Sequence, residues 1–535
     1  MGETATVVDV VDGDTIDVRL DDGSEERVRI IGIDTPETTD NADAERRAEW
    51  EGIEDLSYLG RWGDRASEFA KRELTDATVE LEADANEPDR GSFGRLLRYV
   101  RYDRSGEEDE GGEGSDSASG DASTVYNRAA VAEGYARVYD SGFARHDDYL
   151  DRERSAREGR TRVWKRSDPS QSPEVRDREV ERLFVPEAAS VRTASGAVPD
   201  DRVPVFASPS ATREGGEVSY GDRIPLVAVD GEARVAMVGG PLLDERYEEA
   251  EGFEADTSRF GNYPFATNVL VFLSKGSERP ERVVVDGGHG QFNAEYALSC
   301  EDMAYYLRFL EGQDAALVQQ NDLADGIDGD ALIVCAPAAA YGDSELSAFR
   351  SFVEGGGVVL LLGHGAEGMP ADARENLNAL AEALGSDLRL GDDRVVDAES
   401  NLNDDETLPR TSNFEDSFDL FGPVTPDGST GPSLSVVGVD PSGAEGGAGE
   451  SISLANEGDA PVDLSGWAVA DEAGHEYEFP EGTVVPAGAT VHLLTGEGDD
   501  EVTVHWGRER SVWNDDGDTV SVYDEAGDLV AERSY

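Results

Sequence analysis

Lysine is almost absent from this 535-residue chain. Lys71, Lys165 and Lys275 are the only lysines, so arginine supplies nearly all of the 46 positive charges, against 116 acidic residues. The formal net charge is -70, and the acidic residues are spread through every segment that looks folded, which excludes a merely local acidic tail. Such a surface repels itself at low ionic strength, because screening within about 3 Å needs salt near 1 M. The composition is therefore typical of proteins from salt-loving microbes.

Cysteine and long apolar runs are also scarce. Cys300 and Cys335 are the only cysteines, which excludes a disulfide framework and a zinc site built from spaced Cys and His ligands. No apolar run approaches the roughly 20 residues of a membrane span. The first residues do not resemble a signal peptide, because Val7 and Val8 already begin a strand. We therefore expect a cytoplasmic protein as the sequence is written, or a secreted one if the true start lies upstream.

The length and the apolar content indicate several folded domains. A chain of 535 residues is too long for one ordinary core, and the length suggests about three or four domains. Apolar residues make up 38% of the chain and fall into periodic runs, which excludes disorder throughout. Positive charge is concentrated in residues 1–166, which hold 24 of the 46 basic residues and 42 of the 116 acidic ones.

One stretch near the N-terminus gathers the side chains that cleavage of a phosphodiester requires. Asp14 and Asp34 lie on the two sides of a predicted β-hairpin, which brings them together, and with a loop carbonyl they offer oxygen ligands to a hard divalent cation. Arg29, on the returning strand, can neutralise the charge that gathers on phosphate in the transition state. Glu37 is a suitable base for the attacking water.

The rest of residues 1–166 reads as a small β domain with helices. Alternating apolar residues predict strands near 16–20, 27–33, 79–82 and 96–102, and helical spacing predicts a helix over 59–74. Residues 105–123 are rich in Glu, Asp, Gly and Ser, which indicates an exposed acidic insertion. A final amphipathic stretch ends at Trp164.

Together these motifs resemble the staphylococcal nuclease (thermonuclease) domain. The matching pieces are Asp12-Gly-Asp14-Thr, Arg29 five residues before Asp34, Asp34-Thr-Pro-Glu37-Thr, Gly94-Arg95 before a strand, and the closing segment Ala156–Trp164. The resemblance implies a five-stranded oligonucleotide-binding (OB) barrel with helices over residues 1–166. It also implies a calcium-dependent endonuclease that hydrolyses DNA and/or RNA by metal-assisted attack of water.

The resemblance also implies a role for each matching residue. Asp14 and Asp34 would be carboxylate ligands of Ca²⁺, and the carbonyl of Thr35 would complete the protein's share of the ligands. Glu37 would position or deprotonate the attacking water. The scissile phosphate would be clamped by Arg29 and Arg95.

The sequence departs from the family at two positions near the substrate. Phe93 stands where the family usually has tyrosine before Gly-Arg, so a hydroxyl near the nucleotide is lost and the grip on substrate should be weaker. The family's later substrate tyrosine has no firm equivalent, because Tyr139 and Asp140 compete for that position. A degenerate barrel that binds nucleic acid without cutting it is the alternative function. The filled charged positions favour the enzyme.

Residues 167–200 are polar and weakly periodic and read as a linker, and residues 201–425 follow as an α/β domain. Continuous apolar strands alternate with helices there, which predicts a parallel sheet covered on both faces. The architecture is similar to flavodoxin-like, class I glutamine amidotransferase-like folds. The nucleophile elbow of those enzymes is missing, since Cys335 ends a strand before Ala-Pro, and this counts against placing the main activity here. His289 and His364 each follow a strand, where they could line a ligand pocket or be simple loop residues.

Residues 426–535 are predicted to form a β-sandwich, because short alternating strands are separated by Gly, Asp, Asn and Pro turns. The segment Leu464-Ser-Gly-Trp467, with Trp513-Asn-Asp-Asp-Gly-Asp518, looks like a lamin-tail domain, an immunoglobulin-like module. Such modules are non-catalytic and serve attachment, which implies a protein or surface partner. Trp467 is expected in the core. The sequence thus predicts a multidomain protein with nucleic acid as substrate and no membrane span.

Overall fold

The structure is a computed structural model. It describes residues 2–103, 123–169, 176–221, 223–275, 279–290, 296–366, 368–415, 417–424, 434–441, 450–456, 462–471, 475–480, 482–486, 489–496, 504–508, 512–514, 517–523 and 529–535. Apart from Ser123, the predicted acidic insertion over 105–123 lies outside the described residues. The chain divides into two compact units, one comprising residues 1–275 and 280–423 and the other made chiefly of residues 424–535.

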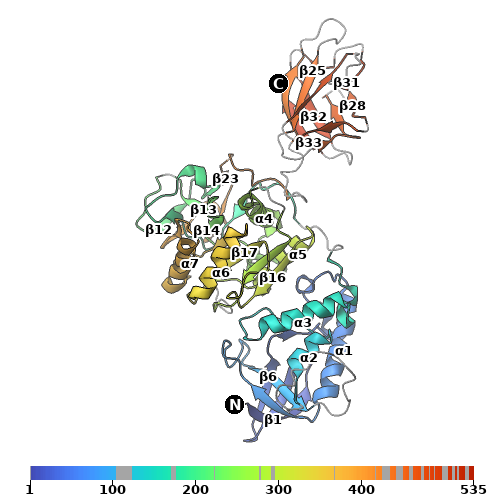
Figure 1. The fold of residues 1–535 in the computed structure, drawn as a ribbon, viewed down its shortest axis with the longest axis vertical. Helices are drawn as coiled ribbons and strands as arrows, with labels where there is room; N and C mark the ends of the chain where they lie inside the picture. The colour runs from blue at the N-terminus through green and yellow to red at the C-terminus, as the bar shows by residue number, and fades with distance from the viewer. Residues whose placement is uncertain are drawn as a thin grey trace. The chain divides into compact units, whose positions relative to one another are not determined.

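A closed β-barrel forms the first part of the larger unit (Figure 1). Its strands are β1 (Glu3–Val10), β2 (Thr15–Leu20), β3 (Glu25–Ile30), β5 (Thr78–Glu82) and β6 (Leu96–Asp103). They are ordered β3-β2-β1-β5-β6 with antiparallel neighbours, and parallel pairing of β3 with β6 closes the barrel. The short β7 (Ser123–Val125) pairs with β6. The predicted OB-type barrel is confirmed, and closure leaves no sheet edge between β3 and β6.

Helices and short elements complete this domain. The helices are α1 (Leu56–Leu74), α2 (Tyr126–Ala132) and α3 (His146–Glu158), and the short elements are β4 (Ile33–Asp34), η1 (Thr39–Ala44), η2 (Arg47–Glu49), β8 (Arg137–Val138) and η3 (Arg162–Arg166). The carboxylate of Asp55 caps α1 by accepting from the backbone N–H of Tyr58 at 3.0 Å. From α1, Phe69 and Leu74 enter the barrel core, where Ile16 and Val18 point inward from β2.

The α/β domain is built on an eight-stranded sheet. In sheet order the strands are β16 (Ala316–Gln320), β15 (Arg282–Asp286), β17 (Ala331–Cys335), β18 (Val358–Leu362), β14 (Val235–Val238), β13 (Pro225–Asp230), β11 (Val205–Phe206) and β23 (Asn413–Phe414). The first five are parallel and the last three antiparallel. The helices are α4 (Asn262–Leu273), η9 (Glu301–Met303), α5 (Ala304–Glu311), α6 (Asp343–Glu354) and α7 (Ala371–Ala383). A parallel α/β sheet is therefore present, with an antiparallel extension that the sequence pattern did not predict.

The prediction of a linker over residues 167–200 was wrong for its second half. β9 (Leu183–Phe184) pairs with β22 (Asp405–Thr411), and β10 (Val191–Thr193) pairs with β19 (Leu388–Leu390). Leu183 and Val191 are fully buried. Leu183-Phe-Val is a short apolar run in an otherwise polar stretch, but these strands are too short to show periodicity and their partners lie about 200 residues later, so the local sequence does not show that they pair. Two further small ladders join β12 (Thr212–Gly215) to β20 (Asp393–Val396) and β21 (Asn401–Leu402) to β22.

The second unit is the predicted β-sandwich. One sheet contains β24 (Leu434–Asp440), β25 (Ser451–Asn456), β30 (Thr490–Leu494) and β31 (Val504–His505), and the other contains β28 (Glu476–Glu478), β27 (Ala468–Ala470), β32 (Thr519–Tyr523) and β33 (Leu529–Ser534). β26 (Val462–Asp463) pairs with β29 (Val484–Val485). Trp467 and Trp513 are buried between the sheets with Ile452 and Val469, so Trp467 is a core residue as predicted. Within the described part of the chain, no helix is long and apolar enough to cross a membrane.

Candidate active site

The β2–β3 hairpin and the short strand β4 bring two carboxylates to one guanidinium. Asp14 immediately precedes β2, and Arg29 lies opposite Thr15 in the β2–β3 ladder. Nη1 of Arg29 is 2.5 Å from Oδ1 of Asp14, and Nη2 donates to Oδ1 of Asp34 at 2.8 Å. The structure therefore brings together Asp14, Asp34 and Arg29, as the hairpin argument predicted.

Asp14 is held as a buried carboxylate. Its Oδ2 accepts from the backbone N–H and the hydroxyl of Thr35, at 2.9 and 2.8 Å, and its Oδ1 accepts from the hydroxyl of Thr15 at 3.0 Å. Burial would raise the pKa of Asp14, but Arg29 and the hydrogen bonds from Thr35 outweigh burial and lower this pKa. The nearby Asp12 behaves in the opposite way, since burial and the charge of Asp14 raise its pKa to about 7.

The oxygens of this cluster suit a hard cation such as Ca²⁺. Each carboxylate oxygen offers two lone pairs. At Asp14 three of them accept hydrogen bonds, from Thr15 and the two donors of Thr35, and Arg29 lies against Oδ1 as an ion pair without a hydrogen bond, so a cation bound there competes with Arg29 for Oδ1. Asp34 accepts one donor on each oxygen and keeps capacity for a cation. Among the described residues, no group of three or more His, Cys, Asp or Glu side chains is arranged for a metal.

Arg95 differs from every other site residue in its pairing. It follows Gly94, whose φ of 76° is a left-handed turn conformation that glycine adopts without strain. In the part of the chain that the structure describes, the Arg95 guanidinium has no ion pair and no hydrogen bond, and it lies 5.5 Å from the centre of the Phe93 ring. Burial and the neighbouring charge of Arg29 lower its pKa. Because Arg29 is already paired with Asp14 and Asp34, it is the Arg95 guanidinium that lacks a counter-charge among the described residues, and an anion could supply it.

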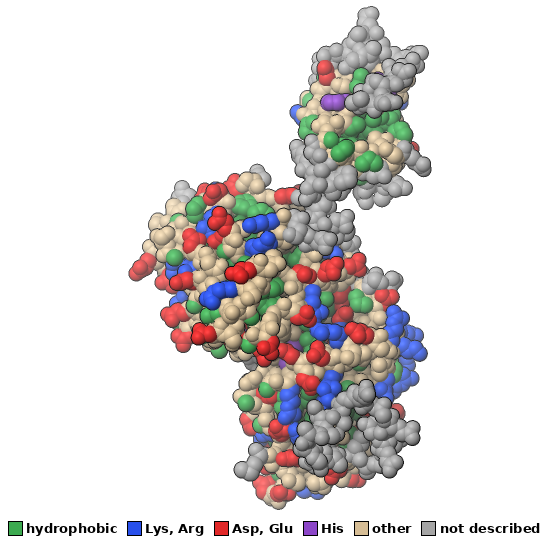
Figure 2. All heavy atoms as spheres, viewed as in Figure 1, with side chains coloured by type: hydrophobic (Ala, Val, Ile, Leu, Met, Phe, Trp, Pro, Cys, Tyr) green, Lys and Arg blue, Asp and Glu red, His purple; other side chains and the backbone are tan. Residues whose placement is uncertain are grey.

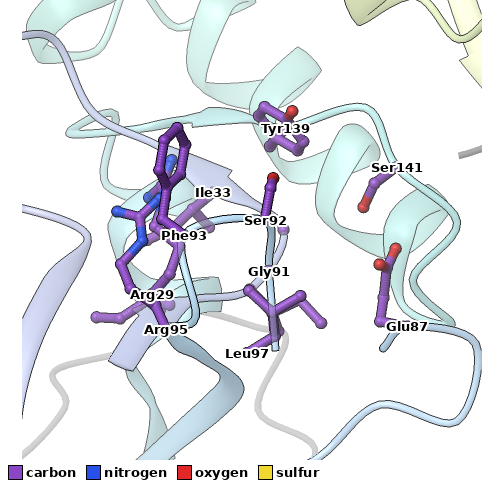
Figure 3. A pocket seen from close by; sticks show the side chains of 13 residues that line it. Arg29, Ile33, Glu87, Gly91, Ser92, Phe93, Arg95, Leu97, Tyr139 and Ser141 are labelled. Atoms are coloured by element: carbon purple, nitrogen blue, oxygen red, sulfur yellow. The ribbon is translucent and has the colours of Figure 1, made fainter. Parts of the chain in front are cut away.

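A hollow of about 190 Å³ opens beside these arginines. Figure 3 shows Arg29, Arg95 and the Phe93 ring gathered on one side, with Glu87 and Ser141 on the other. Tyr139 also lines the hollow, and the Phe93 ring is 84% exposed. Phe93, where the sequence predicts the loss of a hydroxyl, therefore lies in the wall of this pocket. Of the two candidates for the family's later tyrosine, Tyr139 lines the pocket and Asp140 does not.

Glu37 lies on the loop that follows Asp34 and Thr35. Its carboxylate is half-buried and accepts from the side-chain amide of Asn41 at 2.5 Å, while its backbone N–H donates to Glu45 at 2.6 Å. Helix α1 supports the loop closely, because a Cβ at Gly63 would lie 2.3 Å from the carbonyl oxygen of Glu37. The structure records contacts of Glu37 with this loop, and not with Asp14, Asp34 or either arginine, among the described residues.

Sequence reasoning missed Arg137. In the β4–β8 ladder Arg137 lies directly opposite Asp34, and its Nε donates to Oδ2 of Asp34 at 3.1 Å. Its side chain is only 6% exposed. In the sequence, Arg137 stands between two apolar residues, Ala136 and Val138, which could have indicated a buried arginine. Nothing in the local sequence shows which carboxylate it pairs with.

The α/β domain does not bring its two candidate histidines into one cluster. His289 is clamped between Asp286, 2.9 Å from Nδ1, and Glu345, 3.1 Å from Nε2. His364 is buried separately and contacts the carbonyl of Gly365 at 3.2 Å, and burial lowers its pKa. Cys335 is buried at the end of β17, and burial raises the pKa of its thiol, which agrees with a core residue.

Comparison with known proteins agrees with the geometry. Residues 27–166 match the family described as staphylococcal nuclease homologue, and residues 428–535 match the lamin tail domain. An uncharacterised protein of Methanocaldococcus jannaschii is 34% identical over 160 residues, which is 30% of this chain and 70% of that protein. Two thermonucleases, from Staphylococcus hyicus and Staphylococcus intermedius, are 40% and 39% identical over 98 and 99 residues.

The matched segments cover 18% of this chain and about half of each thermonuclease, 48% and 49% respectively. They support a nuclease-type function for the barrel, and the lamin tail match accounts for the sandwich. Neither match reaches the α/β domain, so its similarity to amidotransferases stays a prediction. The chain belongs to the staphylococcal nuclease homologues through residues 27–166 and carries a lamin tail domain over residues 428–535.

Proposed function

We propose that this protein is a calcium-dependent endonuclease that hydrolyses phosphodiester bonds of DNA and/or RNA. The observation that carries the proposal is that one of the two arginines beside the pocket has no counter-charge in the described part of the protein. Arg95 has no anionic partner within the described residues and stands beside Arg29, at the mouth of a pocket next to two carboxylates. A phosphate supplies the missing negative charge.

Asp14, Asp34 and the carbonyl of Thr35 would hold the cation. When bound, Ca²⁺ would supply Lewis acidity at the phosphate and neutralise charge that develops there. The protein's own contribution at Asp14 is to lower the pKa of this buried carboxyl through Arg29 and the Thr35 hydrogen bonds. A site with two carboxylates is expected to bind Ca²⁺ weakly, in roughly the millimolar range.

The two arginines bind and orient the phosphate. Arg29 is already aligned by β3 and by its contacts with Asp14 and Asp34, so it costs little to order on binding. Arg95 can turn its guanidinium to the phosphate without breaking an ion pair among the described residues. Planar donors of this kind bind two phosphate oxygens at once and strengthen as charge develops.

Glu37 accepts a proton from the attacking water. The amide of Asn41 holds one carboxylate oxygen of Glu37, which restricts the rotation of the group. The other oxygen is then available as the base. The close packing of Gly63 against the Glu37 carbonyl keeps the loop near the pocket.

A basic surface on the same domain favours a polymer as substrate. Figure 2 shows Lys and Arg side chains gathered on one side of the nuclease domain, in a protein with a net charge of -70. The exposed cations of α1 and of the region around η3 include Arg61, Arg65, Arg160, Lys165 and Arg166. Arg61 and Arg166 both lie over the Tyr58 ring, 5.9 and 4.7 Å from its centre. Exposed cations of this kind attract the phosphate backbone of a nucleic acid strand.

The test is digestion of plasmid DNA and of a single-stranded RNA by the full chain, with Ca²⁺ or with excess chelator. Salt is fixed near 2 M, because phosphate affinity depends on ionic strength. Calcium-dependent nicking is expected. Undiminished cleavage in chelator would contradict the calcium requirement, and binding without any cleavage would favour a nucleic-acid-binding scaffold instead. The lamin tail domain is expected to bind a protein or surface partner and to leave cleavage unchanged.

A further inference from the structure

A buried ion cluster connects the nuclease domain to the α/β domain and includes Asp34. This Arg137 cluster consists of Arg137, Asp34, Glu49 and Glu301. Nε of Arg137 donates to Oδ2 of Asp34 at 3.1 Å, while Nη1 and Nη2 donate to the two oxygens of Glu301 at 2.7 and 3.0 Å. Nη2 also lies 3.4 Å from the carboxylate of Glu49. One guanidinium therefore serves a proposed metal ligand and a carboxylate from another domain.

The cluster sets the orientation of Asp34. Strands β4 and β8 place Asp34 and Arg137 opposite each other, and Arg29 holds the other oxygen of Asp34 at 2.8 Å. The carboxylate plane is thus defined by one arginine on each side. Both arginines are largely buried, with 16% of the Arg29 side chain and 6% of the Arg137 side chain exposed. A change at Arg137 is transmitted to Asp34 directly.

Glu301 determines in turn how Arg137 points. It opens η9, just before α5, and its side chain is only 9% exposed. The two parallel hydrogen bonds to Arg137 fix the plane of the guanidinium and leave Nε facing Asp34. Glu301 is itself anchored, because Oε1 also accepts from the backbone N–H of Asp140 at 2.8 Å. Removing one partner of such a buried pair leaves the other without compensation.

Other contacts hold the two domains together independently of the cluster. The carboxylate of Asp147 accepts from the backbone N–H groups of Asn321 and Asp322, both at 2.9 Å. The carbonyl of Ser141 accepts from the side-chain amide of Asn321 at 2.7 Å. Arg46 also joins the domains through Glu245 and Glu251, but it is linked to the cluster because it pairs with Glu49 at 2.7 Å. Loss of the Glu301 charge alone is therefore not expected to separate the domains.

We propose that Glu301, a residue of the α/β domain, is a positioning residue of the nuclease site that holds Arg137 in the orientation Asp34 needs to bind calcium. The inference rests on the proposed function of that site. Without the Glu301 carboxylate, the Nη groups of Arg137 turn to the remaining carboxylates, Asp34 and Glu49. A second guanidinium donor on Asp34 competes with the cation for its lone pairs. Outer-shell partners of this kind typically change metal affinity by about 10- to 100-fold.

The test compares Glu301→Gln with a matched control in the full chain. Glu301→Gln keeps the shape and removes the charge. The control is Glu245→Gln, which removes the same charge from the same domain at the Arg46 ion pair. Glu245 does not touch Arg137, and its partner Arg46 also pairs with Glu49, so this control measures what the loss of a neighbouring charge does without the direct contact to Arg137. Calorimetric titration with CaCl₂ at fixed salt measures binding, and the titration of Asp34→Ala is subtracted to remove calcium held by the acidic surface. The calcium dependence of DNA cleavage is measured in parallel.

The expected result is a calcium dissociation constant raised by about 10-fold or more in Glu301→Gln, and within about twofold of the native value in Glu245→Gln. In cleavage assays, the calcium concentration for half-maximal rate should rise while the rate at saturating calcium changes less. Circular dichroism checks folding of each variant. If Glu301→Gln does not fold, Glu301→Asp, which keeps the charge and withdraws the carboxylate by one methylene, is expected to show the same shift.

Equal calcium affinity in the native protein and in a folded Glu301 variant would overturn the inference, and so would an equal loss in Glu245→Gln. Failure of the proposed function has a different signature, since the native protein would then bind calcium through Asp34 without cleaving DNA or RNA. Absence of Asp34-dependent calcium binding in the native protein would overturn both.

Discussion

The pocket arginines of the nuclease domain and the histidine cluster of the α/β domain are both buried or half-buried polar groups, but they differ in how their charges are paired. Around His289 every named group has a partner: Asp286 and Glu345 take its two nitrogens, and the hydroxyl of Tyr341 donates to Asp286 at 2.5 Å. At Arg95 the described residues supply no counter-charge. The His289 cluster has its charges paired inside the fold, whereas Arg95 would gain a counter-charge from the phosphate that we propose it binds.

This difference separates a structural cluster from a binding site more sharply than residue types do. Histidine and carboxylates at the carboxyl end of parallel strands are what sequence reasoning connects with a ligand site. Yet a group whose hydrogen bonds are all satisfied inside the fold has nothing left to offer. An arginine that is partly desolvated and unpaired costs free energy until an anion arrives. The following predictions test whether the pairing of charges distinguishes the binding site at Arg95 from the structural cluster at His289.

The largest effect is expected at the metal site. Asp34→Ala should lower the cleavage rate by about 10³-fold or more, because it removes a proposed ligand of the cation and leaves Arg29 and Arg137 without their shared carboxylate. Single-turnover cleavage of a short oligonucleotide at saturating calcium measures this. Asp17→Ala is the matched control, since Asp17 is on the same hairpin and pairs with Arg27, 2.7 Å away. A native rate in Asp34→Ala would exclude the barrel as the catalyst.

A smaller effect is expected at the unpaired arginine. Arg95→Ala should slow cleavage by about 10²-fold and also weaken oligonucleotide binding, since a guanidinium contacts the phosphate before and during the reaction. Arg27→Ala is the control: Arg27 lies on β3 of the same barrel, but it is already paired with Asp17 through two hydrogen bonds of 2.7 and 2.9 Å. Equal losses in both variants would indicate a general effect of positive charge rather than a phosphate site at Arg95.

A cluster whose charges are already paired should contribute to the free energy of unfolding rather than to cleavage, and the ion pairs of His146 are an example. Burial alone would lower the pKa of His146, but the carboxylates of Asp140 and Asp147, 2.8 and 2.7 Å from its ring nitrogens, raise it to about 9. Because this folded-state pKa lies above the unfolded value of about 6.5, the stabilisation is complete below pH 6.5 and is lost as the pH rises to 9. The shift corresponds to about 3 kcal/mol.

Unfolding by heat or denaturant at pH 6 and pH 9 measures the His146 effect. The native protein should lose more stability over this interval than His146→Gln, which carries no titrating ring. The same decline in both proteins would assign the pH dependence to other groups. Salt must be held constant, because the charge of -70 makes stability depend on screening as well.

What the sequence reveals of the site depends on how far apart the partners lie along the chain. Asp14, Arg29 and Asp34 fall within one hairpin and its exit, so local pairing rules place them together. Arg137 meets Asp34 through a two-residue ladder that spans 103 positions, and Glu301 comes from another domain. No periodicity encodes such contacts, because they depend on how completed elements pack. The short strand Leu183–Phe184 was missed for the same reason.

The smallest effect on cleavage is expected at His289. It tests whether a group whose charges are fully paired inside the fold is dispensable for the reaction. His289→Gln should leave cleavage within about twofold of native, because both ring nitrogens are already engaged with carboxylates of their own domain.

The same variant should change the stability of the protein. Burial would lower the pKa of His289, but Asp286 and Glu345 outweigh it and raise this pKa. As for His146, a pKa that is higher in the folded state than in the unfolded state stabilises the protein at low pH. This stabilisation declines as the pH rises through the folded-state pKa. The variant should therefore cost about 2 kcal/mol at pH 6 and less at pH 8, measured by denaturant unfolding. A folded His289→Gln protein that loses cleavage without losing stability would give the α/β domain a direct part in the reaction, and satisfied pairing would then no longer mark a group as structural.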